Sequence, residues 1–222
     1  MSWSQPLFIS NPVSAIDVPF DGYEKATLRQ MITKFIGSKF KNGKFRAPEE
    51  FLQWYSVYGP ASGLKIKSLD DAARLAAQRD GGSSTIAVRF NIGDLKRYAY
   101  SQAKPSEFQM RLNWVTEVLQ LSTLDARCLG AVCRLTQIEQ FRSFASLLSG
   151  YHERRDEVPS SLVGDLLDIR GSALHNTFSY RGNLIQLGLI DDRGGDDYSP
   201  SDMLIKLLST DTTNPQELED TL

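Results

Sequence analysis

The sequence predicts a mainly helical, α+β protein, with a small sheet in its N-terminal half and a helix-turn-helix followed by a hairpin near its C-terminus. Apolar residues recur at helical spacing along most of the chain. Thr85–Phe90 has the composition of a strand. The glycine pair Gly194-Gly195, inside a charged loop, is typical of a hairpin. The 222 residues, 41% of them hydrophobic, are enough to bury a substantial core.

Three regions are expected. An N-terminal α+β unit spans residues 1–104, a helical domain with the helix-turn-helix spans residues 105–209, and a flexible acidic tail or linker spans residues 210–222. The first boundary is placed at Lys104-Pro105-Ser106, because proline and serine commonly interrupt regular structure. The last segment is acidic and has few large apolar side chains, which favours flexibility.

The N-terminal region is predicted to begin with a helix capped by Asp21, whose carboxylate can accept the free N–H groups of the first turn. The further elements expected are a helix from Pro48 to Gly59-Pro60, a short strand at Leu64–Lys67, a helix over residues 69–78 capped by Ser68, the strand Thr85–Phe90, and a helix over residues 93–102 capped by Asn91.

Two long helices are predicted next. Ser106 caps the first, which reaches Leu121. The second covers Leu124–Leu148 and has room for a kink. Their apolar residues, at spacings of three and four, give each helix one face for the core.

The segment from Pro159 to Leu208 contains the most informative pattern. Ser160 or Ser161 caps a first helix that ends at Gly171, and Ser172 caps a second helix over residues 172–188. A hairpin turns at Gly194-Gly195, with its strands at residues 188–190 and 203–205. Two helices at a sharp angle followed by a β-ribbon form the winged helix-turn-helix plan.

The same region resembles a known family over residues 121–209. The shared patterns are Leu121–Arg127, the acidic and apolar helix Asp165–Asp168, and an L-x-x-L-G-L-I turn at Leu184–Ile190. It is similar to the winged-helix region upstream of the ATPase module in bacterial AAA-type ATPases. The resemblance implies an interaction module that recruits a partner or packs on a motor. This chain has no phosphate loop, because five residues separate Gly37 from Gly43 and no Ser or Thr follows Lys44. ATP hydrolysis would therefore require a motor domain after residue 222.

A basic stretch, Leu28–Arg46, is the first candidate site for nucleic acid. It alternates cations with Phe35, Phe40 and Phe45 and contains no acid. Cations can bind phosphates while aromatic rings stack on bases. The alternative, which we favour, is that the rings belong to the core and the cations to a solvated surface. The candidate residues are Arg29, Lys34, Lys39, Lys41, Lys44 and Arg46.

The predicted helix-turn-helix supplies the second candidate set: Arg170, His175, Asn176, Tyr180, Arg181 and Arg193. Residues 160–209 contain four basic and seven acidic residues, and four minus seven gives −3. Four of the acids lie in the hairpin loop, where they would repel phosphate oxygens. We therefore expect a protein partner, with sequence-specific DNA binding through the 172–188 helix and the basic stretch as the alternative.

Catalysis is not expected, because no residue pattern brings titratable groups together. The chain has two histidines, His152 and His175, and no catalytic triad or metal motif. Cys128 and Cys133 fit reduced core cysteines, so neither a cofactor nor a metal is predicted. No apolar run could span a bilayer and no signal peptide is visible, so the predicted location is cytoplasmic without a membrane partner. The oligomeric state is left open.

Overall fold

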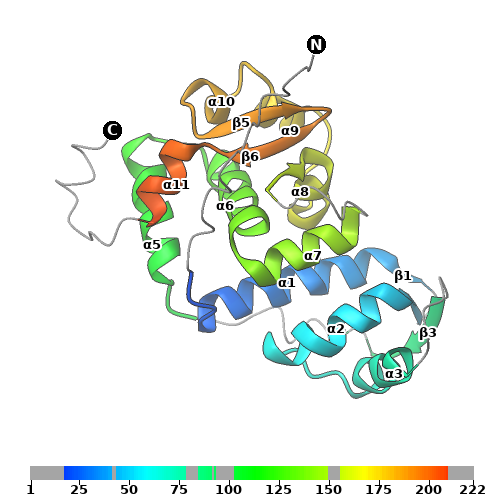
Figure 1. The fold of residues 1–222 in the computed structure, drawn as a ribbon. Coiled ribbons are helices and arrows are strands. Elements are labelled where there is room, and N and C mark those ends of the chain that lie inside the picture. Colours follow the sequence, from blue (N-terminus) through cyan, green and yellow to red (C-terminus); the bar gives the residue numbers. More distant parts are fainter. Residues whose placement is uncertain are drawn as a thin grey trace, which may run out of the picture.

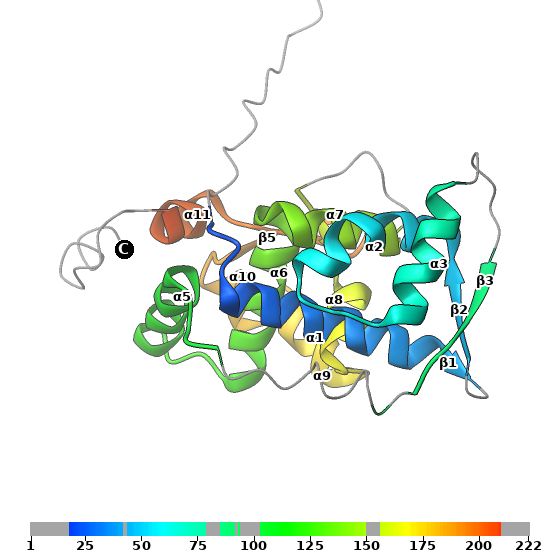
Figure 2. The ribbon, with the colours of Figure 1, turned by 90° about the horizontal axis from the view of Figure 1, so that it is seen from below.

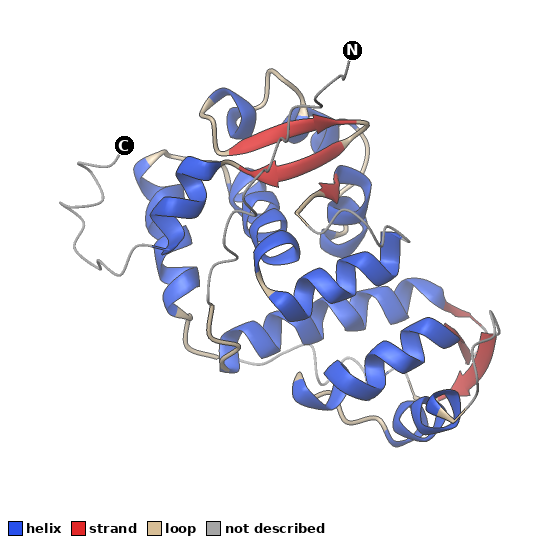
Figure 3. Cartoon of the chain, viewed as in Figure 1, coloured by secondary structure: helices blue, strands red, loops and turns tan. Residues whose placement is uncertain are grey.

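The computed structural model describes residues 18–41, 44–78, 85–91, 93, 103–149 and 156–209. Within these ranges the chain is mainly helical and has two small antiparallel sheets, which lie at separate ends of the molecule (Figures 1 and 3). The coarse prediction of a mainly α, α+β class is confirmed. Residues 210–222 and most of the helix expected over residues 93–102 lie outside the described ranges.

The bounds of the elements are as follows. The helices are α1 (Gly22–Lys39), α2 (Glu49–Ala61), α3 (Lys67–Ala77), α5 (Glu107–Val118), α6 (Thr123–Gln137), α7 (Glu139–Ser149), α8 (Ser160–Leu167), α9 (Ser172–Phe178), α10 (Asn183–Gln186) and α11 (Asp202–Ser209). The strands are β1 (Phe40–Lys41), β2 (Lys44–Pro48), β3 (Thr85–Arg89), β4 (Val158–Pro159), β5 (Ile190–Gly194) and β6 (Asp197–Pro200).

Helix α1 begins where the sequence predicts. The Asp21 carboxylate accepts hydrogen bonds from the backbone N–H groups of Tyr23 and Glu24, which closes the first turn. At its other end α1 leads directly into the first sheet, whose order is β1-β2-β3. Figure 2 shows α1 running from beside α5 to this sheet. The helix therefore connects the two ends of the molecule.

The predicted strand at Leu64–Lys67 is wrong. This segment is the connection from α2 to α3, and α3 begins at Lys67 with Ile66, not Ser68, as its N-cap. The hydroxyl of Tyr55 donates to the carbonyl of Leu64, and the Ile66 carbonyl accepts from the backbone of α3. The alternating pattern therefore comes from a turn held by α2 and α3 and not from pairing with a strand.

The predicted kink in the second long helix is a complete break. Ser122 caps α6, which ends at Gln137, and Ile138 adopts an extended conformation before α7 begins. Every residue of α6 from Cys128 to Gln137 is buried. Helix α6 is thus the central element of this region. The helices α5, α7 and α8 and the strands β4 and β6 of the second sheet pack against it.

The second sheet has the order β4-β6-β5, with all neighbours antiparallel. The predicted hairpin is present, but its turn is one residue later than predicted: Gly194 pairs with Asp197 at the end of β5, and the turn residues Gly195 and Asp196 both have positive φ. The second strand of the hairpin is β6, at residues 197–200, so the prediction of a strand at residues 203–205 is wrong. Those apolar residues belong to α11, whose buried face includes Leu204 and Ile205.

The helices of this region also begin and end differently from the prediction. Helix α8 ends at Leu167, and Asp168, not Gly171, takes the left-handed conformation at its end. Its first residue, Ser160, makes no cap but donates its hydroxyl to the Asp196 carboxylate in the hairpin. The single helix predicted over residues 172–188 is divided into α9 and α10, because the chain turns at residues 179–182.

The buried apolar residues form one continuous cluster from Leu28 to Leu208. The cluster includes residues of both sheets. The packing of α1 against α8 and of α2 against α7 connects its two ends. No helix in the described ranges has both the length and the apolar character needed to cross a bilayer.

Candidate functional site

The basic stretch does not form one surface. Arg29 donates to the Ser62 carbonyl at 3.4 Å, at the end of α2. Lys34 lines a cleft between helices, described below, whereas Lys39 is exposed in the last turn of α1. The remaining cations lie on the strands of the first sheet, where Lys41 is opposite Lys44, Lys44 is opposite Arg89, and Arg46 is opposite Ala87. Arg89 was not among the predicted residues.

The three phenylalanines of this stretch lie among other aromatic rings. Phe45 is fully buried, and the Phe35 ring packs against Phe45, Phe51 and Phe144 with centroids 5.3–6.2 Å apart. The Phe40 ring packs against Phe90. Phe45 is therefore a core residue, and the half-buried Phe35 and Phe40 rings pack against the core, which supports the core interpretation of the stretch.

A second surface is formed by α9, the turn at residues 179–182 and α10, which we call the α9–α10 surface. Tyr180 is 73% exposed, and the Arg181 guanidinium lies 5.5 Å from the centre of its ring. Leu187, just after α10, is 41% exposed. The exposed polar side chains of this surface and its flanks are those of Arg170, Ser172, His175, Asn176, Arg181, Asn183 and Gln186. The structure thus brings five of the six predicted residues of this region onto neighbouring exposed positions.

Arg193, the sixth residue, is held within the hairpin. Its guanidinium donates to the Ser199 hydroxyl at 2.8 Å and pairs with Asp191 at 3.1 Å. The other hairpin acids also have contacts inside the chain: Asp192 accepts from the Gly194 backbone, Asp196 accepts from Ser160, and Asp197 is buried. Burial raises the pKa of Tyr198, and the nearby carboxylates of Asp192 and Asp196 raise it further.

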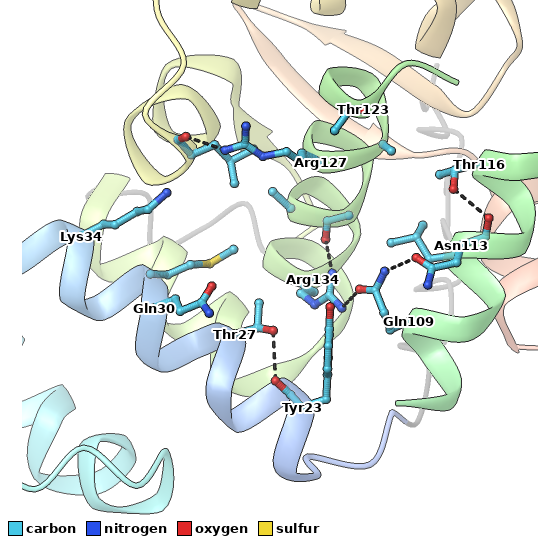
Figure 4. Close-up of a pocket in the computed structure, with 16 residues that line it drawn as sticks. Tyr23, Thr27, Gln30, Lys34, Gln109, Asn113, Thr116, Thr123, Arg127 and Arg134 are labelled. Carbon is cyan, nitrogen blue, oxygen red and sulfur yellow. Dashed lines mark hydrogen bonds between the residues drawn. The ribbon is translucent and has the colours of Figure 1, made fainter. Parts of the chain in front are cut away.

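A cleft of about 350 Å³ opens between α1, α5 and α6 (Figure 4). Each helix contributes residues spaced three or four apart, so each turns one stripe toward the cleft. The residues are Tyr23, Thr27, Gln30, Met31 and Lys34 from α1, Gln109, Leu112, Asn113 and Thr116 from α5, and Thr123, Ala126, Arg127, Gly130, Ala131 and Arg134 from α6, with Leu167 at the end of α8. These stripes are largely polar, whereas helix faces that pack tightly are apolar.

Arg134 forms the polar centre of this cleft. Its guanidinium binds both carboxylate oxygens of Glu24 at 2.7 and 3.0 Å and also donates to the Gln109 side chain at 2.6 Å and to the Gly130 carbonyl. The Ser106 hydroxyl donates to Glu24 at 2.7 Å. Both ionic side chains are buried, with 6% and 0% of their surface exposed. The pair therefore joins α1, α5 and α6 at one point.

Lys34 and Arg127 face one another at the other end of the cleft (Figure 4). Arg127 donates to the Leu167 carbonyl at 2.9 Å, one of the carbonyls that the end of α8 leaves without a helical partner. Burial lowers the pKa of Lys34, the charge of Arg127 lowers it further, and Asp168 opposes both. Both side chains are exposed to solvent, so two positive charges lie close together at the open side of the cleft.

No arrangement for nucleophilic or metal chemistry is visible in the described part of the chain. Burial raises the pKa of both Cys128 and Cys133 to about 12, so their thiols are protonated at neutral pH. His175 is exposed, and His152 lies outside the described residues. No three metal-binding side chains gather anywhere in the described ranges.

Sequence reasoning found Lys34 but not the cleft around it. Arg127 and Arg134 were not expected to be site residues, and neither were the polar residues that share their stripes. The available signal was the helical spacing of the polar residues Tyr23, Thr27, Gln30 and Lys34, which places them on one side of the helix.

Comparison with known proteins adds no relative. No family model matches the chain, and neither a curated protein nor a solved structure is significantly similar to it.

Proposed function

We propose that this chain is a non-catalytic winged-helix interaction module that binds a protein partner through the α9–α10 surface. Support for the winged-helix assignment comes from the order β4-β6-β5 of the second sheet, with α8, α9 and α10 between β4 and β5. In a winged helix, the helix that precedes the hairpin carries the recognition residues. Here that place is taken by α9 and α10.

The observation that carries the proposal is the exposure of Tyr180 beside Arg181 and Leu187. A tyrosine that is 73% exposed offers a large ring for burial, and tyrosine and arginine are enriched at the centres of protein interfaces. The hairpin beside this surface has four acids and one arginine, and one minus four gives −3. The partner surface should therefore offer an apolar pocket next to basic side chains.

The resemblance of residues 121–209 suggests which partner to test first. A AAA-type ATPase motor, in the same polypeptide or in a separate one, is the partner class that this resemblance implies. The absence of catalysis in this chain is part of the same proposal; it is supported by the protonated, buried thiols and by the lack of a group of three metal-binding side chains in the described ranges.

A photocrosslinking residue placed at Leu187 tests the proposal in the full chain. We expect a discrete protein adduct from this position and none from the matched exposed position Leu75, which is 56% exposed on α3. The partner identified by mass spectrometry should bind the purified wild-type chain, and Tyr180→Ala should weaken that binding by about tenfold or more, as for a central aromatic residue. A partner that binds the Tyr180→Ala variant as well as wild type would contradict the proposal.

DNA binding is the second candidate, because residues 169–190 contain no acid and expose Arg170 and Arg181. A gel-shift titration with duplex DNA at increasing salt separates the two functions. The first proposal expects no complex near physiological salt. A complex that weakens steeply with salt, and is lost in the double variant Arg170→Ala and Arg181→Ala, would favour DNA binding.

A further inference from the structure

We propose that the cleft between α1, α5 and α6 binds a small phosphomonoester with a hydroxyl-rich body, such as a sugar phosphate, and that its phosphate lies between Lys34 and Arg127. This site is separate from the α9–α10 surface, so the proposal does not depend on the partner proposed above.

The cleft has the size of a small-molecule site. Its volume of about 350 Å³ lies in the range typical of ligand pockets. The space exists because α6 presents Ala126, Gly130 and Ala131 to it, and none of these fills the gap between the helices. A Cβ added at Gly130 would lie 3.0 Å from the Leu112 side chain and 3.2 Å from the Arg134 guanidinium, so a larger side chain there would push on both. The small residues of α6 thus preserve the opening.

The charge of the cleft favours an anion. Three cations and no carboxylate line it, and only the Arg134 charge is neutralised, by Glu24. In the described part of the chain Lys34 makes neither a hydrogen bond nor an ion pair, and its pKa is lowered by burial and by Arg127. Lys34 and Arg127 are both exposed, and two neighbouring like charges repel each other, which an anion bound between them would relieve. Asp168 compensates for only part of this charge.

The site is held in place before any ligand arrives. The buried Arg134–Glu24 pair fixes α1 and α6 relative to each other, and Gln109 adds α5 to the same network. Arg127 is oriented by its hydrogen bond to the Leu167 carbonyl, which uses one of its five N–H donors. A preorganised site loses less conformational entropy when it binds its ligand.

The remaining lining selects the class of anion. An arginine fork and a lysine ammonium together suit the three acceptor oxygens of a phosphate. Beyond them the cleft offers hydroxyl and amide groups, including Thr27, Gln30 and Asn113, which can bind the hydroxyls of a ligand. The ring of Tyr23 lies against the Arg134 guanidinium, at 5.7 Å. This contact favours a hydroxyl-rich body over a flat base that would need the ring for stacking.

Calorimetric titration of the full chain with glucose 6-phosphate, inorganic phosphate and glucose tests this site. We expect saturable binding of glucose 6-phosphate, weaker binding of phosphate and no binding of glucose. The double variant Lys34→Gln and Arg127→Gln should weaken glucose 6-phosphate binding by about tenfold or more, because two charge-assisted contacts are lost. Lys39→Gln, which removes a lysine of the same helix that does not line the cleft, should leave the affinity within about twofold of wild type.

Two further variants separate the charge from the shape of the site. Lys34→Arg keeps the charge and should retain binding, whereas Ala126→Leu narrows the cleft and should weaken binding without removing a charge. Arg127→Gln could also disturb the end of α8, in which case the single variant Lys34→Gln tests the site. The Lys34 side chain makes no hydrogen bond in the described structure, so its replacement should leave the circular dichroism spectrum unchanged.

Three outcomes would overturn the proposal. The first is the absence of any binding of glucose 6-phosphate at millimolar concentration. The second is binding that is equally strong in the double variant. The third is binding of a single-stranded oligonucleotide that depends on Lys34 and Arg127 while glucose 6-phosphate does not bind, since this would assign the two cations to a nucleic-acid surface.

Discussion

Arg134 is the residue at which the polar contacts of the cleft converge. It is buried, its guanidinium binds Glu24 through two nitrogens, and its plane lies near the rings of Tyr23 and Phe108 at 5.7 and 5.2 Å. A buried charge is tolerated only when it is paired and hydrogen-bonded, and both conditions hold here. The pair therefore makes the arrangement of α1 and α6 depend on two specific side chains.

Replacing Glu24 with glutamine should strongly destabilise the fold. The change leaves the buried Arg134 charge without its counterion, which costs about 3–5 kcal/mol in comparable sites. Urea unfolding followed by circular dichroism would measure the loss. Glu139→Gln is the matched control, because Glu139 is 65% exposed in its pair with Arg142 and its loss should change the stability by less than about 0.5 kcal/mol.

The double variant Glu24→Gln and Arg134→Met gives a second check. Removal of both charges leaves no unpaired ion, so much of the lost stability should return. If the double variant is no more stable than Glu24→Gln alone, the cost comes from lost packing and not from the unpaired charge.

For single residues, contacts between neighbours in the sequence could be predicted, whereas contacts between residues far apart in the sequence could not. The caps formed by Asp21 and Ser106 involve residues two or three positions apart, so the sequence carries their full signal. Glu24 and Arg134 are 110 residues apart, and their charges have no feature that distinguishes them from surface residues of the same kind. Arg127, the other arginine of the cleft, was missed for the same reason.

The short elements around the α9–α10 surface depend on one close backbone turn. Gly182 lies between α9 and α10, and a Cβ at this position would be 2.4 Å from the Thr177 carbonyl oxygen and 2.5 Å from that of Asn176. Backbone atoms cannot move aside as the end of a side chain can. The turn that presents Tyr180 and Arg181 therefore requires glycine.

Gly182→Ala should destabilise the chain by roughly 1–3 kcal/mol, the usual cost of forcing extra atoms into a packed site. It should also weaken partner binding, because the turn carrying Tyr180 must shift. Gly37→Ala is the control: nothing lies within 4 Å of a Cβ added there, inside α1, so this change should stabilise the helix by about 0.5–1 kcal/mol. If both variants shift the unfolding midpoint in the same direction relative to wild type, the explanation from the crowded backbone at Gly182 is wrong.

At the scale of elements, helical periodicity predicted the presence of the long helices better than the division of the short ones. Leu174, Phe178 and Leu184 were assigned to one continuous helix although the last two are six positions apart, and the chain turns at residues 179–182 so that Phe178 packs on Tyr198. The Met203–Ile205 segment was predicted as a strand because a short apolar run does not distinguish a strand from a buried helix. In both cases tertiary packing determined the outcome.

The whole molecule is joined by α1, which contributes to the cleft, to the first sheet and to the contact with α8. The predicted boundary at residue 104 separates α1 from α6, and it would therefore separate Glu24 from Arg134. The composition of the Lys104-Pro105-Ser106 break carries no information about this contact, because it reflects only the local chain.

A fragment of residues 105–209 should not fold on its own. Without α1, Arg134 would lose its counterion Glu24, and the apolar residues of α8 that α1 covers would be exposed. Circular dichroism and the dispersion of amide proton signals would measure this. The full chain is the control, and a fragment with a cooperative unfolding transition would contradict the expectation and support a boundary at residue 104.

The distance in sequence between Glu24 and Arg134 also affects how the chain can mature during synthesis. The ribosome releases α1 long before α6, and the carboxylate of Glu24 has to stay hydrated until the arginine emerges 110 residues later. The first helix can therefore form early but cannot dock early. Final assembly of the region around the cleft must wait for the centre of the polypeptide, so a nascent chain stalled before residue 134 should be the form most dependent on chaperones.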